Sequence, residues 1–442
     1  MTEVAMPLAP LGSDTAADRP FSELLRRQRI RAGLTQRALA DLSTVSARAI
    51  RDLEAGRANA RTQTIHLLVD GLRLQGVARE EFIRASLSGR RTGPFDLDGT
   101  AAAPGAIGAL HGRDAEVGAL VKMLSSGSRR MVSLSGLPGV GKSRMAAEIA
   151  ARVGCGHDWP VLWLGTELPG AGPTLEPAPR SLRALLDESA QDAIAHLRRL
   201  VGRHRAVLVL DGVPEATLAA GVADLLSYCP GLRLISTSRA PWHVPGVQAA
   251  VVSPLATPGP EGPAGYRPET LAEVPSVRLF VERLGEVRPG FTLDRANAGA
   301  VAALCRRLDG LPLALEVAAC QGRVLSVHQL TQLPVPELLD LGVPARGDER
   351  PRTLGGLLGA TVARLSDGQR ALLRELVRHD RAWTVPEVAA VARCPLGETV
   401  GALDVLVGRG LVRTSHGEPA DGLRVPNLLR TYLRRELAAG RS

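Results

Sequence analysis

The sequence predicts a multidomain protein that combines all-α and α/β parts, and three observations support this fold class. Its 442 residues are enough for about three domains, at a typical size of about 150 residues each. Residues 21–87 show short helical patterns separated by turns. From about residue 110, by contrast, the apolar runs MVSLS, VLWLG, AVLVL and LRLIST alternate with helical segments, which is typical of a buried parallel sheet.

Changes in composition predict where these parts begin and end. Residues 1–19 lack a signal-peptide pattern and are expected to be disordered. Residues 89–107 are rich in Gly, Pro and small residues, which predicts a linker. An α/β domain at 108–256, a helical domain at 270–342 and a C-terminal domain at 353–440 follow. In the last of these, HGEPADGLRVP can form a β-wing before the helix NLLRTYLRREL, so we expect a winged helix.

Charge and cysteine content narrow the class of protein. Between Phe21 and Arg90, 13 arginines stand against 7 acidic residues, and the whole chain has a net charge of +9. A basic domain of this kind favours nucleic acid as a partner. No apolar run approaches the ~20 residues that cross a bilayer, so we expect no membrane partner. The five cysteines are scattered and odd in number, as in a reduced, cytoplasmic protein.

The stretch LTQRALADLSTVSARAIRDLEAGRA predicts a helix-turn-helix in an all-α domain at residues 20–88. Thr35 can cap a first helix over residues 36–40, and Ser46 can cap a second one. Ile50 and Leu53 recur at apolar spacing on the inner face of the second helix. In this geometry the N-terminal end of the second helix enters the major groove of DNA. We expect the DNA contacts to come from Gln36, Ser46, Ala47, Arg48, Arg51 and Arg57.

The segments LTQRALA, VSARAI and LEAGR, with the flanking helices, resemble the lambda repressor and Cro type of helix-turn-helix, also called the XRE family. The resemblance implies that double-stranded operator DNA is the partner. Arg48 and Arg51 suit guanine edges, whereas Gln36 and Arg57 are better placed for phosphates. A helical bundle that only mediates protein contacts is the alternative for this domain.

The stretch MVSLSGLPGVGKSRMA fits the P-loop pattern G-x-x-x-x-G-K-[ST] between an apolar strand and a helix. In such a loop, backbone N–H groups face the phosphates, Lys142 reaches the outer phosphates and Ser143 can ligate Mg²⁺. The strand AVLVLD ends in Asp211, which is placed to hold the same metal ion. We therefore expect ATP or ADP with Mg²⁺ as cofactors of a P-loop α/β domain. The phosphate-binding set is expected to be Gly136, Gly139, Val140, Gly141, Lys142, Ser143 and Arg144.

Around this loop, HGRDAEVGALVKML, LRLISTSRAPW and CRRLDGLPLALEVAA occur in an order that resembles STAND ATPases of the NB-ARC type, including AfsR-like and large LuxR-like bacterial regulators. The resemblance implies that the helical domain is ARC1-like. It also implies that Arg113 lies near the adenine, that Pro312 packs by the base or ribose, and that Arg239 senses the terminal phosphate. Arg239 would then form a catalytic set with Lys142 and Asp211. Taken singly, Arg239 fits a surface arginine and Pro312 an ordinary helix start equally well.

The chain departs from that family in places that bear on function. Gly212 follows Asp211 where many hydrolytic enzymes of this architecture place a second acid, and nothing in the sequence places the nearby Glu215 in the site. We therefore expect at most a slow ATPase. Val425, Pro426 and Asn427 stand where plant-type relatives carry Met-His-Asp, so no imidazole is available for the diphosphate. Many relatives continue into ligand-sensing repeats, so we expect the N-terminal domain or a partner protein to act as sensor. A homo-oligomer is a further expected partner.

These patterns favour a transcriptional regulator in which ADP or ATP sets the arrangement of the domains. Two alternatives stay open: an NTPase enzyme that uses the helix-turn-helix for localisation, and a constitutive DNA-binding repressor whose nucleotide fold is a relic. Gly212 argues against the enzyme, and the intact Lys142, Ser143 and Asp211 argue against the relic.

Overall fold

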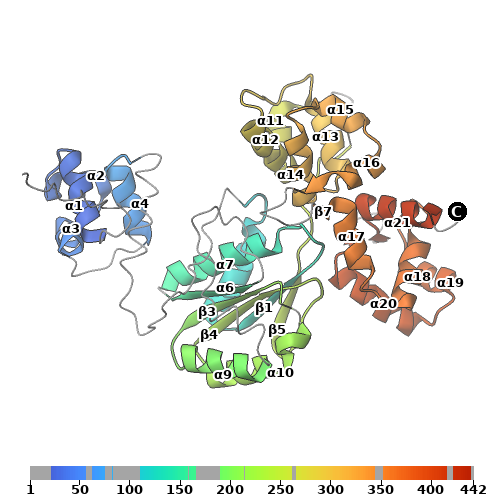
Figure 1. Cartoon of the computed structure of the whole chain (residues 1–442), viewed down its shortest axis with the longest axis horizontal. Coiled ribbons are helices and arrows are strands. Elements are labelled where there is room, and N and C mark those ends of the chain that lie inside the picture. The colour runs from blue at the N-terminus through green and yellow to red at the C-terminus, as the bar shows by residue number, and fades with distance from the viewer. Residues whose placement is uncertain are drawn as a thin grey trace, which may run out of the picture. The chain divides into compact units, whose positions relative to one another are not determined.

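The computed structural model divides into two compact units, residues 1–98 and 99–442, each of which is described by itself (Figure 1). The predicted disordered start and the predicted linker lie outside the residues that the structure describes. Among the described helices, none is both long and apolar enough to cross a bilayer. The described residues are 21–55, 62–74, 82, 110–157, 159–165, 190–213, 215–260, 265–343, 352–415 and 422–439.

The first unit is a bundle of short helices, and both predicted N-caps are confirmed. The Thr35 hydroxyl accepts a hydrogen bond from the backbone N–H of Ala38 (3.1 Å), and the Ser46 hydroxyl accepts one from Ala49 (3.2 Å). The first capped helix continues to Ser43, three residues beyond the predicted end. The helices are α1 (Phe21–Arg31), α2 (Gln36–Ser43), α3 (Ala47–Glu54) and α4 (Thr62–Gly71). Their core includes Phe21, Leu25, Leu39, Ile50, Leu53, Leu68 and Phe82.

Glu54, at the end of α3, ties the first three helices together. Its carboxylate accepts hydrogen bonds from Arg29 of α1 at 2.6 and 3.0 Å and from Gln36 of α2 at 2.8 Å. Burial opposes ionisation of this carboxyl, but the hydrogen bonds from Arg29 and Gln36 outweigh it and hold the pKa of Glu54 below its usual value. Because Gln36 begins α2 and Glu54 ends α3, this network fixes the two helices of the helix-turn-helix against each other.

The second unit contains a five-stranded parallel sheet with the strand order β2-β3-β4-β1-β5. The apolar runs of the sequence became the first four strands, as predicted, and all side chains of β1 and β3 are buried. The edge strand β5 was not predicted, because its sequence VQAAV is short and largely polar or small. The strands are β1 (Met131–Ser135), β2 (Val161–Gly165), β3 (Ala206–Asp211), β4 (Leu232–Thr237) and β5 (Val247–Val251).

Helices cover both faces of this sheet, with α6 and α7 on one side and α9 and α10 on the other (Figure 1). The strand register pairs Asp211 with Thr237, and Thr237 with Leu134 near the end of β1. The carboxyl ends of β1, β3 and β4 therefore meet at the edge of the sheet where the glycine-rich loop begins. The helices are α6 (Asp114–Ser126), α7 (Lys142–His157), α9 (Ala190–Val201) and α10 (Glu215–Tyr228).

The rest of the unit is a helical segment followed by a winged helix. Helices α18, α19 and α20 precede the hairpin β8–β9, and a β-bridge joins Trp383 to Leu423, which is the element order of a winged helix. The tip of the wing, residues 416–421, lies outside the description. The helical segment comprises α11 (Pro268–Ala272), α12 (Pro275–Val287), α13 (Ala298–Arg307), α14 (Pro312–Gln321), α15 (Val327–Gln332) and α16 (Val335–Asp340). Then come β6 (Gly342–Val343), β7 (Arg352–Thr353), α17 (Leu354–Val362), α18 (Asp367–Leu376), α19 (Val385–Ala392), α20 (Leu396–Gly408), β8 (Arg413–Ser415), β9 (Gly422–Arg424) and α21 (Asn427–Ala439).

Candidate nucleotide site and DNA-binding helix

The loop between β1 and α7 depends on glycine at two positions. Gly136 and Gly139 have φ angles of +137° and +74°. A Cβ atom at Gly136 would lie 2.7 Å from the carbonyl oxygen of Val252, and one at Gly139 would lie 2.4 Å from Cβ of Leu313. Both glycines are therefore needed for their backbone conformation and for the close approach of neighbouring segments. Gly141, the last residue of the loop, accepts the first hydrogen bond of α7 through its carbonyl oxygen.

Lys142 begins α7 and turns its ammonium group back into the loop. Its Nζ donates to the carbonyl oxygens of Gly136 (3.0 Å) and Leu137 (2.8 Å). Burial lowers the pKa of Lys142 to about 8, while Asp211 opposes this shift and Arg239 adds to it. A phosphate group at this loop would favour the charged lysine again. The loop and its lysine therefore fit the phosphates of a nucleotide.

Asp211 is buried at the end of β3, with 4% of its surface exposed. Its carboxylate accepts a hydrogen bond from the Thr237 hydroxyl, whose oxygen in turn accepts one from the backbone N–H of Gly212 (2.9 Å). Thr237 lies in the quoted stretch LRLISTSR, but the sequence had not given it a role. Among the described residues, no group of three or more acidic, His or Cys side chains could hold a metal ion alone. The Mg²⁺ roles of Ser143 and Asp211 stay predictions.

Gly212 and Glu215, which follow Asp211, do not change the expectation that ATP hydrolysis is slow. Gly212 has a left-handed backbone with φ +72°. The carboxylate of Glu215 accepts a hydrogen bond from the backbone N–H of His243 (2.6 Å) and lies 3.5 Å from its Nδ1. Glu215 is thus held by the segment after β4, and neither Gly212 nor Glu215 supplies a base beside Asp211.

Arg113 links three segments around the loop. Its Nη2 donates to the carbonyl oxygens of Val140 (3.1 Å) and Ser253 (2.5 Å), and its Nη1 lies 3.3 Å from Glu116. The side chain is 4% exposed, and its burial lowers the pKa of Arg113. This guanidinium therefore holds the buried Val140 of the loop against the segment after β5. Its predicted place near an adenine stays a prediction.

The helical segment contacts the phosphate loop directly. The backbone N–H of Leu313 donates to the carbonyl oxygen of Gly139 (3.1 Å), and Pro312 stands at the first turn of α14 beside it. Arg144 of α7 also belongs to this boundary, because burial and the charge of Arg283 in α12 lower the pKa of Arg144. The structure thus brings the GLPLA stretch and the loop together, and the place of Pro312 beside a base or ribose stays a prediction.

The winged helix also lies against the phosphate loop, through a glycine that the sequence did not single out. A Cβ atom at Gly410 would lie 3.1 Å from the backbone nitrogen of Leu137 and 3.4 Å from Cα of Gly136. One at Gly408 would lie 2.7 Å from Cγ of Pro241, close to Arg239 in the chain. The only signal was the sequence GRG at a helix end, which occurs in ordinary C-caps as well.

Asp309 joins the helical segment to the winged helix. Its carboxylate accepts a hydrogen bond from the backbone N–H of Leu428 (2.8 Å), in the first turn of α21. Arg413 of β8 donates to the carbonyl oxygen of Asp309 (3.2 Å), and the Asn427 amide donates to that of Arg306 (3.3 Å). Burial raises the pKa of Asp309, while the Leu428 N–H and Arg413 oppose this shift. The N-terminus of α21 is therefore capped by a residue more than a hundred positions earlier.

In the first unit, the predicted DNA contacts gather at the start of α3. The exposed or half-buried residues there are Ser46, Ala47, Arg48 and Arg51. Ile50 and Leu53 are buried on the opposite face, so Arg48 and Arg51 are turned to solvent. The amide of Gln36 donates to Glu54, so this predicted phosphate contact is held within the bundle. Arg57 lies outside the described residues.

Comparisons with known proteins support the first unit most directly. A model of a helix-turn-helix domain family matches residues 20–82, so the chain carries a helix-turn-helix domain at its N-terminus. A Mycobacterium tuberculosis protein, named provisionally as an HTH-type transcriptional regulator, is 30% identical over 315 residues. That match covers 69% of this chain and 33% of the relative, so this chain spans about a third of the relative's length. An uncharacterized protein of the same species is 28% identical over 74% of this chain and 81% of its own length.

Similarity to solved structures is weak. A Signal Transduction ATPase with Numerous Domains from Pyrococcus horikoshii, which carries a tetratricopeptide repeat sensor, is 14% identical with a TM-score of 0.30, over 78% of this chain and 44% of its own. NtrX from Brucella abortus, in complex with ADP, is 15% identical with a TM-score of 0.29, over 78% and 76% of the two chains. At these scores the fold assignment depends on the strand order and helix packing of this chain alone.

Nucleotide binding should depend on pH through Lys142. The free protein holds the pKa of Lys142 at about 8, and a bound phosphate raises it, so binding is coupled to proton uptake. The affinity for ADP is therefore expected to fall about tenfold between pH 7 and pH 9, as measured by calorimetry. Lys122→Arg, which changes the other lysine of the chain, should keep this dependence. An affinity that stays level over this range would contradict the assignment of Lys142.

Proposed function

We propose that this chain is a transcriptional regulator in which the helix-turn-helix binds operator DNA and the ATP or ADP state of the second unit controls that activity. One observation carries the proposal: the phosphate loop lies where three parts of the second unit meet. Leu313 of the helical segment bonds to Gly139, and Gly410 of the winged helix packs on Leu137. A ligand held by this loop therefore acts on the contacts that keep the three parts together.

The switch requires that ADP and ATP stabilise different arrangements, since tight binding alone shifts no equilibrium. The added γ-phosphate of ATP would enter the region of Lys142 and Arg239, near Pro241 and the docked Gly408. We infer that ADP favours the docked winged helix and that ATP with Mg²⁺ disfavours it. Gly212 beside Asp211 fits a slow ATPase that holds each state for a long time.

Lys142→Ala should strongly weaken nucleotide binding and change operator occupancy or oligomeric state. Loss of one charge-assisted contact to phosphate weakens binding about 10- to 100-fold. The nucleotide that copurifies with the chain identifies the resting state, and DNA binding and mass are then measured after exchange to ADP or ATP. Unchanged DNA binding and assembly in every nucleotide state would favour a relic fold. Turnover of many ATP molecules per second would favour an NTPase enzyme.

Gly410→Asn should weaken docking of the winged helix on the loop. Asn tolerates a left-handed backbone such as the φ of +71° at Gly410, so the added side chain mainly tests the close approach. Overpacking of about 1–3 kcal/mol corresponds to a nucleotide release rate raised about 5- to 150-fold, measured with a fluorescent ADP analogue. Gly290→Asn is the matched control, because Gly290 has φ +91° and open space around it. If both variants release the ADP analogue at the same rate, the winged helix does not contribute to the nucleotide site.

Arg48→Ala and Arg51→Ala should reduce specific DNA binding more than nonspecific binding. A bidentate contact between arginine and guanine contributes about 1–3 kcal/mol to discrimination, or about 5- to 150-fold in affinity. Fluorescence anisotropy measures binding to an operator duplex and to a scrambled duplex, and the comparison separates specific from nonspecific affinity. Arg31→Ala removes an exposed charge at the end of α1 and should weaken binding to both duplexes by the same factor. The same uniform loss from Arg48→Ala would assign this residue to phosphates.

A further inference from the structure

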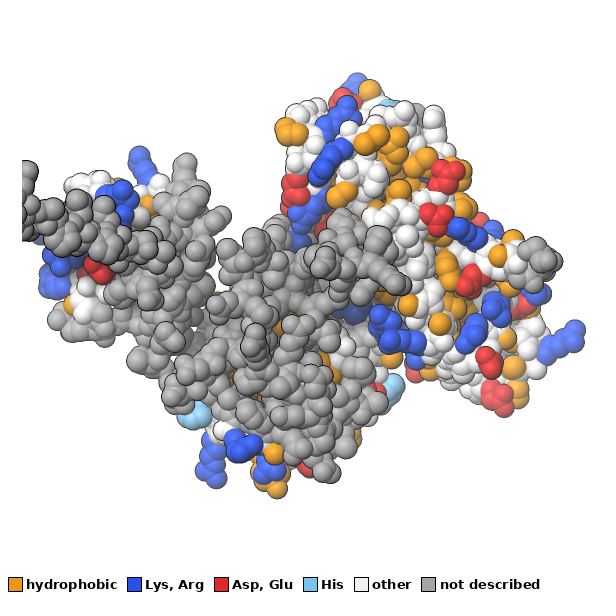
Figure 2. Space-filling view, in the orientation of Figure 1, with side chains coloured by type: hydrophobic (Ala, Val, Ile, Leu, Met, Phe, Trp, Pro, Cys, Tyr) orange, Lys and Arg blue, Asp and Glu red, His pale blue; other side chains and the backbone are white. Residues whose placement is uncertain are grey.

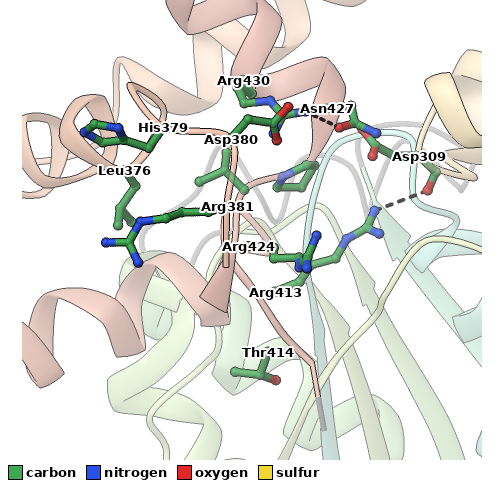
Figure 3. A pocket seen from close by; sticks show the side chains of 12 residues that line it. Asp309, Leu376, His379, Asp380, Arg381, Arg413, Thr414, Arg424, Asn427 and Arg430 are labelled. Carbon is green, nitrogen blue, oxygen red and sulfur yellow. Dashed lines mark hydrogen bonds and ion pairs between the residues drawn. The ribbon is translucent and has the colours of Figure 1, made fainter. Parts of the chain in front are cut away.

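A second basic site lies in the winged helix, in a pocket of about 330 Å³. Figure 3 shows its side chains, which come from the end of α18 and the turn after it, the hairpin β8–β9, the start of α21 and Asp309 of the helical segment. None of the lining residues belongs to the phosphate loop. The charged side chains that matter are Asp309, Asp380, Arg381, Arg413, Arg424 and Arg430.

Two of these arginines face each other across the wing hairpin. Arg413 of β8 and Arg424 of β9 are direct partners in the antiparallel register. Directly opposed residues project to the same face, and Leu423, the next residue of β9, is buried on the other face. Like charges directly opposite each other destabilise an antiparallel strand pair. This pair therefore costs the fold stability unless an anion compensates it.

The other two arginines of the pocket already have partners. Arg381 forms an ion pair with Glu387 (2.6 Å) and lies 3.9 Å over the ring of Trp383. Arg430 forms an ion pair with Asp380 and donates to the Asn427 side chain. Their charge is therefore neutralised within the winged helix.

Arg413 and Arg424 are compensated far less. Within the described part of the chain, neither forms a salt bridge, and the buried Nε of Arg413 has no hydrogen-bond partner. Among the described residues, Arg413 donates one side-chain hydrogen bond, to the carbonyl oxygen of Asp309 (3.2 Å). The Asp309 carboxylate itself is committed to the N–H of Leu428. Burial lowers the pKa of Arg413, with Asp309 opposing the shift, so an anion here would be stabilised by a desolvated guanidinium.

We propose that the Arg413–Arg424 pair binds the phosphate group of a small phosphorylated molecule, at a site separate from the phosphate loop. Two guanidinium groups on adjacent strands supply several parallel N–H donors, which match phosphate oxygens better than a monovalent halide. The pocket has room for a phosphate or diphosphate with a small attached group. Because Asp309 lines the same pocket, a ligand there contacts the boundary between the helical segment and the winged helix. The site stands whether or not nucleotide controls DNA binding.

Titration of the full chain with inorganic pyrophosphate tests this site. The measurement uses the Lys142→Ala background, which removes the main grip of the phosphate loop, and follows the heat of binding at constant ionic strength. Arg424→Ala is the main variant, because this side chain is exposed and its loss leaves the core intact. It should weaken pyrophosphate binding about 10- to 100-fold, and Arg424→Lys should recover part of the loss. Arg413→Ala should give a loss of similar size.

Arg374→Ala is the matched control, because it removes an exposed positive charge from α18 outside the pocket. It should leave pyrophosphate binding within about twofold, since a charge that touches no ligand is screened by salt. Pyrophosphate binding that is absent, or that Arg424→Ala leaves unchanged, would overturn the proposal. Weaker binding to a nonspecific DNA duplex with unchanged pyrophosphate affinity would overturn it too, and would assign the two arginines to the DNA backbone.

Discussion

The backbone of the phosphate loop is packed so closely by its neighbours that the rest of the second unit depends on this contact. Gly136 lies against Val252, Gly139 against Leu313, and Leu137 against Gly410. At Gly136, Gly139 and Gly410 there is no room for even a Cβ atom unless neighbouring atoms shift, so a shift of the loop by a fraction of an ångström must move the helical segment or the winged helix. Close-packed interiors respond to such a shift by changing between discrete arrangements, not by stretching. This constraint makes the loop a suitable place for a ligand that controls domain arrangement.

The charge of Lys142 is a second reason why a ligand at the phosphate loop would control the domain arrangement. The ammonium group of Lys142 is partly buried, donates to backbone carbonyl oxygens and is coupled electrostatically to Asp211 and Arg239. Without an anion the loop therefore carries an electrostatic cost, which a phosphate removes. The packed glycines and Lys142 lie in the same short loop, so a phosphate bound there would be coupled to domain docking.

Local features of this fold could be predicted from the sequence, whereas contacts between distant segments could not. The caps at Thr35 and Ser46 and the four apolar strands depend on neighbouring residues, and the structure has them where the pattern placed them. Thr237 and Asp309 acquire their roles only when strands and domains come together. Asp309 in particular has the sequence context of a turn residue, and its left-handed backbone before Gly310 fits that role. Nothing local indicates that its carboxylate caps a helix 119 residues later.

The cap by Asp309 bears on how the winged helix can be held without an imidazole at residues 425–427. In this chain the start of α21 is bound by a carboxylate of the helical segment, through Leu428, and by the Asn427 amide on Arg306. These bonds join the winged helix to the helical segment without using the nucleotide. Gly410 is then the part of the winged helix that contacts the phosphate loop. A nucleotide would therefore act on docking mainly through the loop backbone, while Asp309 keeps the winged helix tied to the helical segment in either state. The two parts would move together as one body against the parallel sheet.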